Sequence, residues 1–330
     1  MGHPRHLMLT VRLEGNRVHI GDRFAVSFQR TLRIPDDGNS YPLPPGLGLL
    51  PVHAVADYPG RTPAWWHADE FFIPMYQREA LWLGFDGTPW KPNAVQVGVG
   101  GIDAISGESR QPGLEASPQN YLVCPDQPWL DGINTGTGVI RQFVAMPLGS
   151  GYTIEAQLTG DERVGGIQLV VFEPKPGRFP DRPPTEPGTP PADLRIFGSR
   201  ALGTELGLAA GGRMEQRIYR DAYGIDTWDG SQFAEVFVHI ANSEQYEAMT
   251  GHPPPETPVN ARVYTDHGLP WFALYDESRD AVSGSARLAT VRSTADIDRA
   301  RTGHTSTDDR PIEVSDAQMR KLKGTPPFTA

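Results

Sequence analysis

The chain has 330 residues, a formal net charge of -10 and one cysteine. The acidic balance and the absence of a dense Lys/Arg cluster argue against a phosphate backbone as the main partner, so no nucleic-acid partner is expected. The single cysteine excludes an intrachain disulfide framework and a CxxC zinc site. No run of apolar residues is long enough for a transmembrane helix, and the first fifteen residues lack the apolar core of a signal peptide. Together these features favour a cytoplasmic protein, with export by another route left open.

Glycine and proline, at 36 and 32 residues, are together about twice as frequent as usual, which indicates many short strands joined by turns. From residue 7 onward, apolar and polar residues alternate as they do in half-buried strands. The pattern breaks at Gly15-Asn16, which predicts a hairpin over residues 6–21. It resumes over residues 24–34, and three consecutive strands with short connections predict antiparallel pairing.

Further strands are expected up to residue 172. We predict one long strand within 65–86 with a polar interruption near residues 77–79, and others at 95–99, 102–105, 139–146, 154–158 and 167–172. About eight strands are enough for a sandwich or barrel. Residues 1–173 are therefore predicted to form an antiparallel β-sandwich or jelly-roll-like domain.

The rest of the chain is predicted to be organised differently. Residues 174–192 are rich in proline and are interpreted as a linker or arm, because proline cannot supply the donors of a central strand. Residues 193–290 are predicted to form a smaller α+β region. Its clearest features are a strand at 234–240 and a short helix that begins after Asn242 or Ser243.

The last forty residues, 291–330, are predicted to be a polar tail with one short helix. Ser315 and Gln318 have the spacing of a capping box, and Gly324 would end the helix.

Two histidines and an aspartate suggest a metal site as one alternative. His67 and Asp69 are two residues apart and would share one face of a strand, and His239 or His267 would supply a third ligand. Such a site would bind iron or zinc, as in jelly-roll oxygenases. The competing interpretation is that His67 belongs to an aromatic cluster and bonds to a nearby carboxylate, in which case the protein needs no cofactor.

Tryptophan in turns is the most distinctive feature of the composition. Exposed aromatic rings beside carboxylates bind sugars, and aromatic residues also dominate protein interfaces. The competing interpretation is that each ring seals one end of the core. The candidate contact residues are Trp90, Trp129, Trp228 and Trp271.

Other motifs are weaker. Cys124 would be a nucleophile only if a histidine and an aspartate came from elsewhere, and a buried packing role is the simpler interpretation. The residues that begin at Gly98 resemble G-x-G-x-x-G, but Asp103 occupies the third glycine position, so a turn is favoured over a nucleotide site. The segment 203–212 has no Walker lysine and is interpreted as small-residue packing.

Four segments resemble those of a family of bacterial hypothetical proteins. The resemblance covers most of the chain between about Gln29 and Tyr275, and it implies that both regions belong to one recurring unit. It carries over no catalytic residues. The segments are YLVCPDQPWLDG (121–132), IRQFVAMPLGSGYT (140–153), GLAAGGRMEQRIYRDAYGIDTWD (207–229) and HGLPWFALYDE (267–277).

Long loops on a rigid β scaffold suit recognition or assembly. The sequence is therefore interpreted as that of a non-catalytic binding or structural protein that associates with itself or with a protein partner through sheet edges or aromatic loops. The metal-dependent enzyme centred on His67 and Asp69 is the first alternative, and a carbohydrate-binding protein is the second.

Overall fold

The computed structural model describes residues 9–182, 205–256, 259–274 and 279–322. The first residues of the predicted hairpin, the Pro-rich residues 183–192 and the predicted helix stop at Gly324 lie outside this part of the chain, as do Gly203 and Thr204. None of the described helices is both long and apolar enough to cross a membrane.

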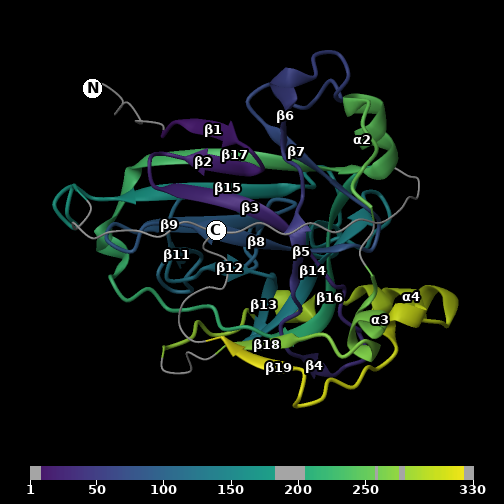
Figure 1. Cartoon of the computed structure of the whole chain (residues 1–330). Helices are drawn as coiled ribbons and strands as arrows, with labels where there is room; N and C mark the ends of the chain where they lie inside the picture. Colours follow the sequence, from purple (N-terminus) through teal and green to yellow (C-terminus); the bar gives the residue numbers. More distant parts are fainter. Residues whose placement is uncertain (1–8, 183–204, 257–258, 275–278, 323–330) are drawn as a thin grey trace.

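Short strands make up most of the described elements, and they are labelled in Figure 1. The strands are β1 (Val11–Glu14), β2 (Arg17–Ile20), β3 (Phe24–Thr31), β4 (Ser40–Tyr41), β5 (Gly46–Leu49), β6 (His53–Ala54), β7 (Phe71–Met75), β8 (Ala80–Asp86), β9 (Asn93–Val99), β10 (Ile102–Asp103), β11 (Leu122–Cys124), β12 (Trp129–Leu130), β13 (Gly132–Gly136), β14 (Val139–Pro147), β15 (Ile167–Pro174), β16 (Leu206–Glu215), β17 (Trp228–Asn242), β18 (Trp271–Leu274) and β19 (Met319–Leu322). The α-helices are α1 (Ile154–Thr159), α2 (Ser243–Thr250), α3 (Ala261–Asp266) and α4 (Thr294–Thr302), and the short 3-10 turns are η1 (Val55–Asp57), η2 (Ile225–Thr227), η3 (Leu288–Thr290) and η4 (Thr307–Asp309).

Among the described residues, β1 to β17 form one continuous, mainly antiparallel sheet, and β18 pairs in parallel with β19. The sheet folds into two layers. Pairing runs through β2, β3, β8, β14 and β16 in the first layer, and through β7, β17, β15 and β9 in the second. A single pair, Leu206 with Ile240, joins β16 to β17. In Figure 1, β2 and β3 lie in front of β15 and β17. The predicted mainly-β, sandwich-like fold is confirmed.

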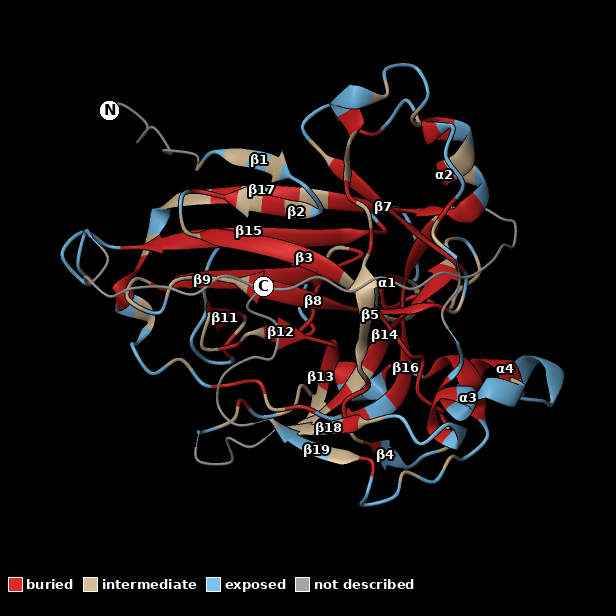
Figure 2. Cartoon of the chain, viewed as in Figure 1, coloured by how far each residue is buried: buried red, intermediate tan, exposed pale blue. Residues whose placement is uncertain are grey.

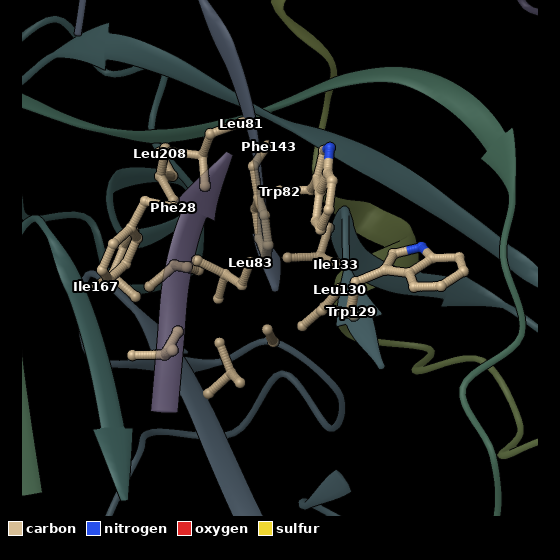
Figure 3. Packing of buried hydrophobic residues seen from close by; sticks show 14 of the residues in the cluster. Phe28, Leu81, Trp82, Leu83, Trp129, Leu130, Ile133, Phe143, Ile167 and Leu208 are labelled. Atoms are coloured by element: carbon tan, nitrogen blue, oxygen red, sulfur yellow. The ribbon is translucent and has the colours of Figure 1, made fainter. Parts of the chain in front are cut away.

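The main core fills the space between these layers. Every second residue of β9, namely Val95, Val97 and Val99, belongs to it, and so do Phe28 and Leu83 of the facing layer. Figure 2 shows the central strands buried along most of their length, and Figure 3 shows the Phe and Leu side chains of β3, β8 and β14 in contact. The alternation of the sequence is therefore the signature of this inward face.

The other face of the second layer is covered by two smaller clusters rather than by a third layer of sheet. One cluster forms around Tyr121, Phe172 and Trp228, and the other around Trp66, Phe72 and Tyr246. Because residues directly opposite in an antiparallel pair share a face, this outer face is where β9, β15 and β17 present their remaining side chains.

The first predicted hairpin is confirmed, since β1 and β2 pair antiparallel around Gly15. The predicted strand at 154–158 is wrong, because these residues form α1. Thr153 caps this helix by accepting a hydrogen bond from the N–H of Ala156, and Gly160 ends it in the left-handed region at φ 80°. Helix α2 begins and ends as expected, with a capping box formed by Asn242 and Gln245.

Two other predictions need correction. Residues 65–86 do not form one long strand. The extended backbone is interrupted at Arg78, whose φ is 69°. This turn separates β7, which joins the second layer, from β8, which joins the first. The helix expected after Ser315 is also wrong. Gln318 Oε1 accepts from Ser315, but the chain then extends into β19.

Strands from both sides of the Pro-rich segment share the main sheet. β16 pairs with β14 along most of its length, and β17 pairs with β15. The division into units at 1–173 and 193–290 stays a prediction about how the chain is organised. Helices α2 and α3 lie within residues 193–290, and α4 lies within residues 291–330.

Candidate functional site

Three of the four candidate tryptophans are buried. Trp129 is 7% exposed and lies 6.3 Å from Trp82 between ring centroids. Trp228 donates from Nε1 to Asp221, and Trp271 donates from Nε1 to Thr265. Trp129 and Trp271 belong to the main core and Trp228 to a smaller cluster, and each ring leaves little surface for a ligand.

The fourth, Trp90, is partly exposed and lies under the guanidinium of Arg23, 5.9 Å from the ring centroid. The structure therefore does not bring the four tryptophans together on one surface.

The candidate metal ligands are arranged differently from the prediction. His67 and Asp69 are exposed, and His239 is buried. His239 Nε2 lies 2.7 Å from Glu70 Oε2, and its ring stacks on Trp66 at 4.1 Å. Within the described part of the chain, no group of three or more His, Cys, Asp or Glu residues is placed to hold a metal ion.

Burial lowers the pKa of His239 to about 4, against the opposing effect of Glu70, so this imidazole is neutral near pH 7. Cys124 is free and buried, as the packing interpretation expects, and burial raises the pKa of its thiol well above the usual value. A thiol in this state is a poor nucleophile.

A polar cleft of about 350 Å³ lies at a place that the sequence did not single out. It is formed by β9, β10 and the loop of residues 106–120 that covers them. Its inner part is built by Gln96, Asp103, Ser106 and Arg110.

Asp103 lies at the inner end of this cleft and is only 2% exposed. Its Oδ1 accepts hydrogen bonds from the N–H groups of Ile105 and Ser106 and from Ser106 Oγ, at 3.0, 2.7 and 2.9 Å. Its Oδ2 has no hydrogen-bond partner within the described residues. Burial raises the pKa of Asp103 to about 7, against the lowering effect of these hydrogen bonds and of Arg110. Near neutral pH the carboxyl group therefore exists in both its donating and its accepting form.

Arg110 lies beside Asp103 and crosses the outer face of β9. Its Nη2 reaches Glu235 Oε2 at 3.4 Å, while Nε and Nη1 are buried with no hydrogen-bond partner in the described part of the chain. The side chain fits because residue 98 is glycine. A Cβ at Gly98 would lie 2.5 Å from Arg110 Cδ. The absence of a side chain at this position thus makes room for a buried cation.

The loop over the cleft is held by side-chain amides. Gln96 Nε2 donates to the carbonyl of Gly113 at 2.8 Å, and Asn120 Nδ2 donates to the same oxygen at 3.0 Å. Asn120 Oδ1 also accepts from the N–H of Glu115 at 2.8 Å. The cleft is therefore already formed without a ligand, which lowers the entropic penalty of binding.

The rim of the cleft is exposed and polar. The side chains of Ser109, Gln111 and Glu115 make no hydrogen bond or ion pair with the described residues, whereas Glu108 pairs with Arg287 at 2.6 Å. Donors and acceptors thus surround the opening, and the cleft is lined by three carboxyl groups and one guanidinium.

No family model, curated protein or solved structure matches this chain. The cleft was also hard to find from sequence. Asp103 stood out only as the residue that breaks a glycine motif, and nothing marked Arg110, because its burial depends on Gly98 and on a strand 125 residues away.

Proposed function

We propose that the protein is a non-catalytic binding protein and that its cleft at Asp103 and Arg110 takes a neutral, hydroxyl-rich ligand, that is, a carbohydrate. The observation that carries this proposal is the set of unpaired buried atoms at the cleft: Asp103 Oδ2 and Arg110 Nε and Nη1. A buried polar group without a partner loses about 1–3 kcal/mol, so a ligand that pairs these atoms gains affinity.

The charges around the cleft favour a neutral ligand. Asp103, Glu108 and Glu115 would repel an anion, and the partly neutralised Arg110 would repel a cation. A hydroxyl group both donates and accepts, so a sugar satisfies amide, carboxyl and guanidinium groups without a charge conflict. The volume also lies near the lower end of the range of about 300–1,000 Å³ for small-molecule sites.

This proposal keeps the predicted binding role and moves the carbohydrate site from the tryptophans to the cleft. Self-association, or a protein partner, stays a prediction that sedimentation velocity over a range of concentrations would check. The metal-dependent alternative at His67 and Asp69 has less support, because His239 is already bonded to Glu70.

The experiment is a glycan array followed by titration calorimetry with the best ligand. We expect neutral glycans to bind, and Arg110→Gln to weaken binding at least about tenfold, since a hydrogen bond to a charged group contributes about 1.5–3 kcal/mol. The control is Arg299→Gln, which removes a cation from the exposed face of α4. Circular dichroism checks that both variants are folded.

Two results would contradict the proposal. One is an array on which wild-type protein binds no glycan. The other is a folded Arg110→Gln protein with the affinity of the wild type.

A further inference from the structure

We infer that the ligand is an oligosaccharide rather than a single sugar, because a second contact surface, formed by Phe237 and Trp65, lies on the same sheet face as the cleft. This inference rests on the proposed function and specifies the form of its ligand. The surface formed by Phe237 and Trp65 would be a stacking subsite beside the polar cleft.

The strand register places the two surfaces close together. Gly98 of β9 is opposite Gln168 of β15, and Gln168 is opposite Phe237 of β17. Opposite residues in antiparallel pairs point to the same side, so Phe237 shares the outer face with the cleft. Two strand spacings separate Phe237 from Gly98, about 9–10 Å. β9, β15 and β17 follow one another in this order in Figure 1.

Polar side chains occupy the row between the two surfaces. Arg110 extends from the cleft over Gly98 to Glu235, which lies two residues before Phe237 on the same face of β17. Gln168, in the row between, is buried and supports the row from within, because its Oε1 accepts from the N–H of Gly101 and its Nε2 donates to the carbonyl of Gly165. A ligand that leaves the cleft along this row meets the Arg110–Glu235 pair, of which Glu235 is the exposed member, before it reaches an aromatic ring.

Trp65 is the exposed end of this path. Its residue is 49% exposed, in contrast to the buried Trp129, Trp228 and Trp271. Two rings hold it in place: the edge-on contacts are 5.2 Å to His239 and 6.0 Å to Trp66.

His239 links the two aromatic residues of the subsite. Its ring lies 4.4 Å from Phe237, and Glu70 fixes its orientation from the other side. An exposed indole whose neighbours are locked presents a rigid apolar surface, which gives contact area at a low entropic penalty. The apolar C–H face of a pyranose ring fits this surface, while its hydroxyls reach the polar groups of the row. One sugar ring does not span the two strand spacings from Gly98 to Phe237, so the occupant is a chain of sugars.

The test measures how affinity depends on chain length. The best glycan from the array is prepared as a series from one unit to six, and each length is titrated against wild-type protein, Trp65→Ala, Phe237→Ala and Arg110→Gln. We expect wild-type affinity to rise at least tenfold along the series. Trp65→Ala should abolish this rise and leave the affinity for the shortest binding glycan unchanged, whereas Arg110→Gln should weaken every length.

Leu269→Ala, which also truncates a half-exposed apolar residue, is the control and should behave as the wild type. Tryptophan fluorescence gives a second readout, because a long glycan should change the emission of wild-type protein and not that of Trp65→Ala. Affinity that does not depend on length, or a rise that persists in Trp65→Ala, overturns the oligosaccharide inference and leaves the cleft intact. If no length binds, the proposed function fails as well.

Discussion

Asp103 and Asp131 are both buried to 2% exposure, and burial raises the pKa of each to about 7. They differ in what surrounds them. Gln216 donates from Nε2 to Asp131 Oδ2 at 2.5 Å and accepts from the N–H of Asp131 at 3.0 Å, so one amide pairs with both groups. Asp103, which lines a cleft, is bonded at Oδ1 and has a buried Oδ2 without a partner among the described residues.

The carboxyl group of Asp131 is therefore structural, whereas that of Asp103 can still accept or donate one more hydrogen bond. Around Asp131, buried amides join residues 119–131 to residues 216–221. Gln127, for example, donates to the carbonyl of Trp129 and accepts from the N–H of Tyr219. Such a network contributes to a unique packed arrangement only when every member is satisfied. Around Asp103 the network is incomplete, and Asp103 lines the cleft.

The largest effect is expected from Gln216→Ala. The substitution leaves the buried N–H of Asp131 without a partner and removes the hydrogen bond at Oδ2, which should destabilise the fold by about 4 kcal/mol. Urea denaturation monitored by tryptophan fluorescence measures it.

The matched control is Gln111→Ala at the rim of the cleft, an exposed glutamine with no bond to the described residues. It should change stability by less than about 0.5 kcal/mol. Equal losses in the two variants would show that the amide at Asp131 has no special structural role.

The next largest effect concerns pH. Each aspartate has a folded-state pKa near 7, above its unfolded value near 4, so the folded protein holds a proton that the unfolded chain releases between these values. Stability should therefore fall as pH rises from 4 to 7 and become constant above that. From pH 5 to pH 8 each residue accounts for about 3 kcal/mol.

Asp103→Asn and Asp131→Asn should each remove one residue's share of this pH-dependent loss of stability. Each variant should therefore be more stable than the wild type at pH 8. Saturating glycan should change the pH dependence of the wild type and of Asp131→Asn, but not that of Asp103→Asn. If the difference between each variant and the wild type is the same at pH 5 and pH 8, the raised pKa is refuted.

Sequence patterns anticipated the strands that line the core but not the groups at the cleft. Period-two alternation identified β9 and β15 because their Val and Ile residues fill the space between two layers. The same pattern wrongly predicted a strand at residues 154–158, where the N-cap at Thr153 favours a helix. The cleft could not be predicted from alternation, because the position of Arg110 depends on the lack of a side chain at Gly98 and on a contact with a distant strand. Tryptophan in turns was the strongest compositional signal, but three of the four candidate tryptophans pack in the interior and do not line a binding surface.

A smaller effect is expected from Ser106→Ala. Ser106 Oγ donates to Asp103 Oδ1 at 2.9 Å, and two backbone N–H groups remain bonded to that oxygen after the substitution. The loss should be about 1 kcal/mol, well below that at Gln216, because the carboxyl group keeps partners. Ser109→Ala, at an exposed serine on the rim without a bond to the described residues, should be neutral in the same urea assay. A loss as large as that of Gln216→Ala would mean that Asp103 is as strictly structural as Asp131.

Gly98→Ala should have the smallest effect on stability and a large effect on binding. The new methyl group would stand 2.5 Å from Arg110 Cδ and 3.1 Å from Gln168 Oε1, so the flexible arginine must leave its place over β9. Alanine also lowers the conformational entropy of the unfolded chain, which offsets part of the loss of stability. We expect the free energy of unfolding to change by less than about 1 kcal/mol. Glycan affinity should nevertheless fall at least about tenfold, as with Arg110→Gln, because the guanidinium no longer borders the cleft.

Gly230→Ala is the matched control, because a Cβ at Gly230 meets no atom within 4 Å and the residue lies in the exposed part of β17. It should leave affinity unchanged. A Gly98→Ala protein that binds as well as the Gly230→Ala protein would show that the position of Arg110 does not matter for the ligand. The contrast between a closed Asp131 and an open Asp103 would then have no functional meaning. A Gly98→Ala protein that is folded but does not bind would instead show that this contrast depends on the missing side chain at Gly98, which keeps Arg110 beside Asp103.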